Sequence, residues 1–147
     1  MKLKVTGSVG DAPKEAKAAR ATRGPQGARQ EVGRRGEQLA AAFYEGRGQE
    51  VLASNWRTRS GELDLVVRDE AARRLVFVEV RSLSRPGVIA PEQTVRGGKQ
   101  ARVRAQAQAW LSANAEYATG WVVCFDVVGV VLSTGELVHV PSAFEGE

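Results

Sequence analysis

Two short apolar segments joined by a polar turn, all within residues 61–81, constrain the fold of this chain more than any other feature. The first segment covers residues 61–67 and the second residues 75–81, and both are rich in valine and leucine. Residues 68–74, between them, are charged residues and alanines. Apolar, β-branched segments bounded by turn-forming residues are typical of strands, so we expect two strands of a hairpin with a rather long connection.

The first of these expected strands carries two acidic residues, Glu62 and Asp64, which alternate with two leucines. Successive side chains of a strand point to opposite faces. We therefore expect both carboxylates on one face of the sheet, and Leu63 and Leu65 on the other.

The second expected strand is apolar on both faces, which is typical of a central strand. Three valines line one face, and Glu79 and Arg81 share the other with Leu75 and Phe77. Glu79 therefore lies near a dry interior, where an unpaired carboxylate is costly. Two compensations are compatible with the pattern: a salt bridge to a nearby arginine, or a divalent cation such as Mg²⁺ held between Asp64 and Glu79.

Length and composition are those of one ordinary domain, because 147 residues can bury a core without disulfides or metal clips. The single cysteine, Cys124, lies in an apolar run, so no intrachain disulfide is possible and we expect a buried core thiol. The sequence has no apolar run of about eighteen residues and no signal-peptide pattern. We expect a soluble, cytoplasmic protein with no membrane association.

Positive charge is concentrated at the start of the chain. Residues 1–36 contain nine Lys and Arg and three acids, whereas residues 37–147 contain twelve Lys and Arg and fourteen acids. Residues 1–30 have few large apolar side chains, so we expect a disordered basic tail, followed by a domain over residues 31–147. The tail suits contact with phosphates, and a solvated tail without a role is an equal alternative.

Apolar residues recur every three or four positions in two further segments, which predicts helices over residues 31–47 and 94–114. Glu37 lies at the edge of the apolar stripe of the first helix, so its side chain could point toward the sheet; a first-turn acid favoured by the helix dipole is the alternative. Lys99 lies on the inward stripe of the second helix, and Arg96 is near it. Such a lysine needs an anionic partner, either the acids of the sheet or a phosphate.

Three more strands are expected, over residues 50–57, 120–132 and 136–140, with an irregular segment over residues 82–93. The order of elements is then a helix, three strands, a helix and two strands, which indicates an α/β domain. His139 is expected on an edge strand of the sheet.

Polar and aromatic residues after the first expected strand suit the rim of a nucleic-acid site, with Arg57 and Arg59 as phosphate contacts. Asn55 and Trp56 precede them, although Trp56 is more readily a packing residue. A further acid, Asp126, interrupts an apolar strand and, like Glu79, needs a partner.

Six motifs combine in one chain: Gly36-Glu37, Asn55-Trp56-Arg57, Gly61-Glu62-Leu63-Asp64-Leu65, Phe77-Val78-Glu79-Val80-Arg81, Lys99 and Phe125-Asp126-Val127-Val128. Together they resemble the YraN family of bacterial proteins. That family is assigned to the PD-(D/E)xK nuclease superfamily and is similar in layout to archaeal Holliday junction resolvases. The resemblance covers about residues 31 to 145.

The resemblance implies a restriction-endonuclease-like three-layer core, in which helices flank a mixed central sheet of about five strands. It implies that Asp64 and Glu79 ligate Mg²⁺ or Mn²⁺, helped by the carbonyl of Val80, and that Glu37 reaches the same site. The residue two positions after the second acid is normally lysine in the superfamily, whereas here it is Arg81. Arginine stays protonated, so Lys99 is the remaining candidate for a catalytic lysine.

The leading hypothesis is a metal-dependent endonuclease that hydrolyses phosphodiester bonds of DNA, including structured or branched DNA. The alternative is a catalytically inactive, nuclease-fold module that binds nucleic acid through its basic tail and loops. The candidate nucleic-acid-binding residues are Arg57, Arg59, Arg96 and Lys99. A third hypothesis is a protein-interaction domain, such as a homodimer, in which the acids are only structural.

Overall fold

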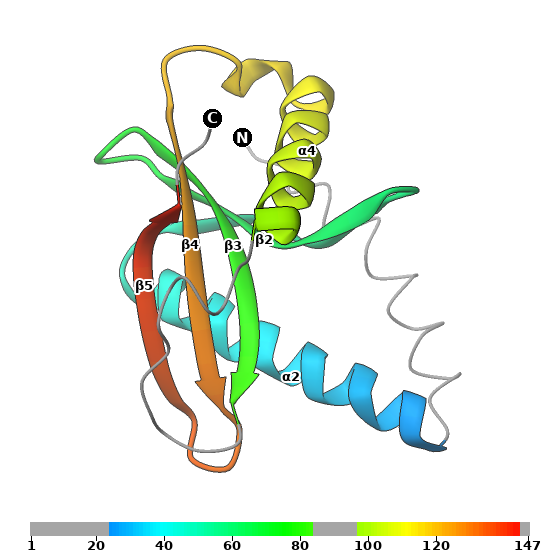
Figure 1. Cartoon of the computed structure of the whole chain (residues 1–147). Helices are drawn as coiled ribbons and strands as arrows, with labels where there is room; N and C mark the ends of the chain where they lie inside the picture. Colours follow the sequence, from blue (N-terminus) through cyan, green and yellow to red (C-terminus); the bar gives the residue numbers. More distant parts are fainter. Residues whose placement is uncertain (1–23, 84–96, 145–147) are drawn as a thin grey trace.

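The structure is a computed structural model that describes residues 24–83 and 97–144 (Figure 1). The described elements are α2 (Gly24–Gly46), β1 (Glu50–Thr58), β2 (Gly61–Asp69), β3 (Arg74–Leu83), α4 (Gly97–Ala113), the short 3-10 helix η1 (Ala115–Tyr117), β4 (Val122–Val131) and β5 (Glu136–Phe144). Apart from η1, this is the expected order of helices and strands.

The five strands form one mixed sheet in the order β1-β2-β3-β4-β5. β3 and β4 run parallel, and every other neighbouring pair is antiparallel. A parallel pair needs a long crossover connection, and α4 lies within that crossover. β3 is the middle strand, so the prediction of a central strand over residues 75–81 is confirmed.

α2 and α4 cover opposite faces of the sheet and make the domain three-layered (Figure 1). On one face Ala40 and Tyr44 of α2 pack with valines of β2, β3 and β4. On the other face Val103, Ala107 and Trp110 of α4 pack with a cluster that includes the aromatic residues of β3 and β4. Both faces of β3 are therefore buried, which explains its unbroken run of valine, leucine and phenylalanine.

Two predicted boundaries were wrong by several residues. α2 begins at Gly24, so residues 24–30, expected in the disordered tail, belong to the helix. Pro25 suits the first helical turn, and the Gln, Ala and Arg residues that follow favour helix. β5 continues past Pro141 to Phe144, because an edge strand tolerates a proline that lacks a donor. α4 is described over Gly97–Ala113, so the expected start of this helix at residue 94 and the other expectations for residues 1–23 and 84–96 lie outside the described residues.

β2 departs from the expected alternation next to its acids. Leu63 belongs to the core cluster under α4, whereas Leu65 belongs to the cluster under α2. The neighbouring strand β1 is irregular where it lies beside these two leucines, since Asn55 has a left-handed φ of 53°. Such a residue interrupts regular pleating, so the prediction that both leucines share one face was wrong.

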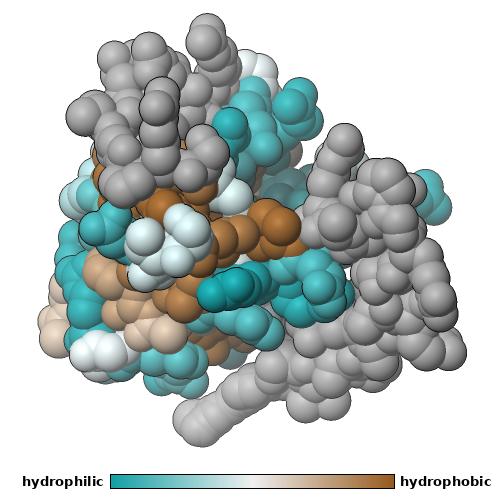
Figure 2. All heavy atoms as spheres, turned by 90° about the horizontal axis from the view of Figure 1, so that it is seen from below, coloured by the Kyte–Doolittle hydropathy of each residue, from teal (hydrophilic) through white to brown (hydrophobic). Residues whose placement is uncertain are grey.

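Few large hydrophobic side chains are exposed among the described residues. Seen from below, hydrophobic residues form a band with hydrophilic residues on both sides (Figure 2). Among the described residues the large hydrophobic side chains that are exposed are Val32 on α2 and Val122 at the start of β4. Two valines on different elements do not define an interface, so a homodimer stays a prediction.

Within residues 24–83 and 97–144 no helix is long and apolar enough to cross a membrane.

Candidate active site

A pocket of about 470 Å³ opens where β2 and β3 stop pairing. The ladder between these strands runs from Asp69 and Arg74 to Leu65 and Val78. Just beyond the Leu65–Val78 end of this ladder, the backbone N–H of Val80 donates a hydrogen bond to a side chain, Asp64 Oδ2, at 2.8 Å. The strands diverge there, and α2 and α4 form the side walls of the pocket.

The pocket brings together the acids that the sequence singled out. Glu37 reaches it from α2, Glu62 and Asp64 from β2, and Glu79 from β3. The carboxyl group of Asp64 lies close enough to that of Glu37 to raise the pKa of Glu37. A proton on one of the two carboxyl groups would relieve the repulsion between them. The expectation that Glu37 points toward the sheet is confirmed.

Burial and crowding raise the pKa values of this pair. Burial, with the negative charges of Asp64 and Glu62, raises the pKa of Glu37 to about 8. Burial and the negative charge of Glu79 raise the pKa of Asp64 to about 7, although the Val80 N–H and Lys99 oppose the shift. Both carboxyl groups therefore exchange protons near neutral pH, where ordinary carboxyl groups are fully ionised.

Cationic side chains compensate the other two acids. Lys99 Nζ lies 3.0 Å from Glu79 Oε2, whereas Arg81 Nη1 lies 3.8 Å from the same oxygen. Arg57 Nε lies 3.1 Å from an oxygen of Glu62. The expected salt bridge to Glu79 therefore exists, but the nearer cation is a lysine from α4 rather than an arginine. Asp64 has no cation in direct contact among the described residues.

The donor set suits a hard divalent cation, since every candidate ligand is a carboxylate oxygen. Magnesium is commonly held by one or two carboxylates, with waters and substrate phosphates completing its coordination. Within the described residues no three His, Cys, Asp or Glu side chains are grouped as a ready metal cage. The roles of Asp64 and Glu79 as metal ligands therefore stay a prediction. Val80 contacts Asp64 through its N–H, and a role for its carbonyl stays a prediction.

The basic residues predicted to bind nucleic acid lie at different depths. Arg57 and Arg59 are exposed, at the end of β1 and in the β1–β2 turn, and Lys99 lines the pocket. Arg96 lies outside the described residues.

Arg102 also lines the pocket, although it was not predicted from the sequence to be in the site. Its position three residues after Lys99 puts both on one face of α4, and this spacing could have identified it.

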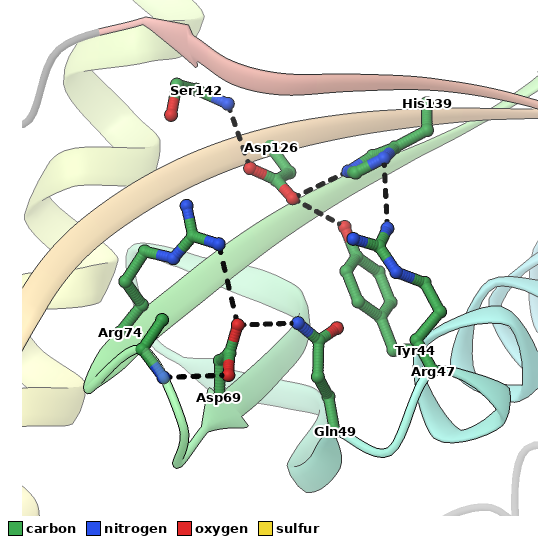
Figure 3. A network of polar contacts seen from close by, with 9 residues as sticks. Tyr44, Arg47, Gln49, Asp69, Arg74, Asp126, His139 and Ser142 are labelled. Atoms are coloured by element: carbon green, nitrogen blue, oxygen red, sulfur yellow. Dashed lines mark hydrogen bonds and ion pairs between the residues drawn. The ribbon is translucent and has the colours of Figure 1, made fainter.

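A second cluster of polar residues surrounds Asp126 at a different place on the sheet (Figure 3). Asp126 accepts hydrogen bonds from the Tyr44 hydroxyl at 2.8 Å and from the Ser142 N–H at 3.0 Å, and His139 Nε2 lies 2.8 Å from the same carboxylate. Arg47 Nη1 lies 3.4 Å from His139 Nδ1. Because arginine only donates, Nδ1 accepts and Nε2 carries the proton that His139 donates to Asp126. The partner that Asp126 was expected to need is therefore a set of three donors.

Hydrogen bonding determines the protonation of this second cluster. Burial opposes ionisation of Asp126, but the hydrogen bonds from His139, Ser142 and Tyr44 outweigh it and lower the pKa of Asp126 below its usual value. Burial raises the pKa of the Tyr44 hydroxyl, which stays protonated as a donor. The cluster joins α2 to β4 and β5, and the prediction that His139 lies on an edge strand is confirmed.

The fold and the pocket define a class of protein: a three-layer α/β domain in which a mixed sheet carries buried acids where two antiparallel strands diverge. A family model described as uncharacterised protein family UPF0102 matches residues 36–130, which include Glu37, Asp64, Glu79 and Lys99. The chain belongs to this family, as the motif resemblance predicted.

Relatives of similar length support this assignment. A UPF0102 protein of Anaeromyxobacter dehalogenans is 45% identical over 121 residues, which cover 81% of this chain and 87% of the relative. A UPF0102 protein of Nocardia farcinica is 42% identical and covers 74% of this chain and 83% of the relative. A UPF0102 protein of Lawsonia intracellularis is 36% identical, with 78% and 86% covered.

Proposed function

We propose that this protein is a metal-dependent phosphodiesterase that cleaves DNA, as its resemblance to the nuclease superfamily implies. The observation that carries the proposal is the pocket that crowds Glu37, Asp64 and Glu79 beside lysine and arginine, and raises the pKa of Glu37 to about 8 and that of Asp64 to about 7. Structural acids are normally satisfied by donors, whereas perturbed, crowded carboxyl groups in a cleft are typical of catalytic sites.

Asp64 and Glu79 would hold Mg²⁺ or Mn²⁺, with Glu37 beside them. A bound divalent ion would lower the pKa of a water molecule and neutralise charge on the attacked phosphate. The residues of the chain supply the remaining requirements. Glu37, with a pKa of about 8, would be mostly protonated at neutral pH and could donate a proton there. Lys99, at the wall of the pocket, adds positive charge where a phosphate would enter.

Arg81 and Lys99 have different roles in this proposal. Arg81 cannot act as a general base, but its guanidinium can donate a pair of hydrogen bonds to phosphate oxygens. Lys99 is a compact charge 3.0 Å from Glu79, so it occupies the neighbourhood expected for the superfamily lysine although it comes from α4. We propose that Lys99 replaces the lysine that is absent from position 81.

A second candidate function is a module that binds nucleic acid without cleaving it. The observation that favours it is the ion pair between Lys99 and Glu79, because a cation of the chain already neutralises one proposed metal ligand. Arg57 and Arg59 would then hold the phosphate backbone through charge alone, and binding would weaken steeply with added salt.

The experiment that separates these functions incubates the protein with linear, nicked and four-way-junction DNA in Mg²⁺, in Mn²⁺ and in EDTA. We expect cleavage with either metal and none in EDTA. Asp64→Asn should lower the single-turnover rate at least about 100-fold, because it removes a metal ligand. Glu116→Gln, which changes an exposed acid of η1, is the matched control and should keep full activity.

Two results would contradict the proposal. Salt-sensitive DNA binding without cleavage under any metal condition would replace it with the binding module. Neither binding nor cleavage of any of the DNA substrates would reject both functions.

A further inference from the structure

Gln106 is a buried amide on α4 that has its hydrogen-bonding partners in a surface turn. Its side chain is 2% exposed. The Thr58 hydroxyl donates to Gln106 Oε1 at 2.8 Å, and Gln106 Nε2 donates to the Ser60 hydroxyl at 2.9 Å. The two hydroxyl oxygens are 3.3 Å apart, so the amide and the hydroxyl groups form a closed ring. This ring joins the middle of α4 to the β1–β2 turn.

Packing of the core does not require an amide at this position. Neighbouring inward residues of α4, such as Val103 and Ala107, are apolar, and an apolar side chain would avoid the cost of burying a polar group. Thr58 and Ser60 are exposed and could instead hydrogen-bond to water. The amide therefore adds directional contacts that hold the turn in one position relative to α4.

The turn is also held by close packing against the same side chain. A Cβ atom at Gly61 would lie 3.3 Å from Gln106 Cγ, so the backbone at the start of β2 lies directly on the glutamine. Gly61 immediately precedes Glu62, and both line the pocket together with Gln106. The amide thus fixes the wall of the pocket from which β2 begins.

Two arginines project from the hairpin that Gln106 fixes, and a third lies one turn before Gln106 on α4. Arg57 and Arg59 are exposed on the hairpin, and Arg102 is exposed at the pocket. Within residues 24–83 and 97–144, Arg59 and Arg102 lie in no ion pair. Cations on two sides of an acidic pocket can hold a phosphate backbone over it only if the distance between the two sides is constant.

We infer that Gln106 is a positioning residue, which fixes the β1–β2 hairpin so that Arg57 and Arg59 hold the nucleic-acid backbone on one side of the pocket while Arg102 holds it on the other. This inference rests on the proposed function and adds a substrate contact surface to it. The surface recognises phosphates of the backbone and not the bases, because its side chains are arginines, which bind phosphate oxygens.

The test compares Gln106→Met with Gln108→Leu, a matched change of an exposed glutamine on the same helix. Methionine keeps the length of the side chain and removes both hydrogen bonds. We expect Gln106→Met to weaken DNA binding about five- to tenfold and to raise KM with little change in kcat, because the hairpin must be ordered again when DNA binds. The slope of log affinity against log salt should fall by about 1. Gln108→Leu should leave all of these values unchanged.

Two further measurements show that the effect passes through the hairpin. Amide hydrogen exchange of residues 59–62 should become faster in Gln106→Met. Arg59→Ala should weaken binding in the wild-type background and have little effect in Gln106→Met, because the arginine is no longer positioned. If Gln106→Met does not fold, Ser60→Ala removes the Nε2 partner from the surface and should give the same direction of change.

The outcomes separate this inference from the proposed function. DNA affinity of Gln106→Met equal to that of wild type, or equal effects of Arg59→Ala in both backgrounds, would overturn the positioning role alone. Failure of the wild-type protein to bind DNA would overturn the proposed function, whatever the hydrogen-exchange result.

Discussion

Asp126 and Asp64 are two largely buried acids of the same sheet, and their surroundings differ in one respect. Asp126 accepts from Tyr44, Ser142 and His139, and its pKa is lowered. Asp64 receives one backbone N–H, lies among the other acids of the pocket and has a pKa raised to about 7. A complete set of donors makes the first acid a structural residue. The incomplete set around the second leaves it with capacity for a ligand.

The position of each acid in the sheet accounts for this difference. Asp126 lies in β4 between α2 and the edge strand β5, so donors from both elements surround it (Figure 3). Asp64 lies where the β2–β3 ladder has ended, so one strand no longer supplies regular backbone donors and the space becomes a pocket. Interruption of a ladder is a common way of exposing functional groups within a sheet.

The largest effect that tests this comparison is on stability. Asp126→Asn should lower the free energy of unfolding by about 2–4 kcal/mol, because an amide NH₂ placed in the cluster must face at least one donor. Asp64→Asn should leave stability unchanged or raise it, because it removes one of several crowded charges. Urea unfolding of both variants at neutral pH measures the difference. Equal destabilisation by the two substitutions would show that Asp64 is as structural as Asp126.

A smaller effect concerns pH. The folded-state pKa values of Glu37 and Asp64, about 8 and about 7, lie above the ordinary values of 4.5 and 3.8. The stability that these groups contribute is therefore complete below about pH 4 and is lost as pH rises through 7 and 8. Asp126 has a lowered pKa, so its contribution stays constant across neutral pH.

The metal-free domain should accordingly lose stability between about pH 6 and about pH 8.5, and Mn²⁺ should raise Tm more at the higher pH, where the carboxyl groups are ionised. Thermal unfolding with Mn²⁺ and with EDTA at several pH values measures this. The double variant Glu37→Gln with Asp64→Asn should show a much flatter profile. A Tm increase by Mn²⁺ that is independent of pH would contradict a link between Mn²⁺ binding and the ionisation of Glu37 and Asp64.

Local periodicity in the sequence predicted most of the pocket residues in this comparison. Alternation in two neighbouring strands identified Asp64 and Glu79, and helical stripes identified Glu37 and Lys99, because each inference needs only residues close in sequence. The same reasoning recognised that Asp126 needs a partner, but not which one. Tyr44 is 82 positions away in sequence, and such a contact depends on how α2 crosses the sheet.

Irregular backbone explains what the sequence analysis missed. The left-handed Asn55 breaks the alternation that would have put Leu63 and Leu65 in one cluster. The last strand was expected to end at residue 140, so Ser142, whose N–H donates to Asp126, was left outside it. Gln106 occupies an inward position of a helix with an apolar stripe, and a polar residue at such a position could have been noticed as a sign of a specific contact.

Calorimetric titration of Mn²⁺ into the metal-free protein tests the central claim, that the incompletely satisfied acids of the pocket form a divalent-cation site. Wild type and Glu116→Gln should bind Mn²⁺ equally, whereas Asp64→Asn and Glu79→Gln should lose binding while remaining folded. Absence of Mn²⁺ binding by the wild-type protein, or the same affinity in wild type and both pocket variants, would contradict the account.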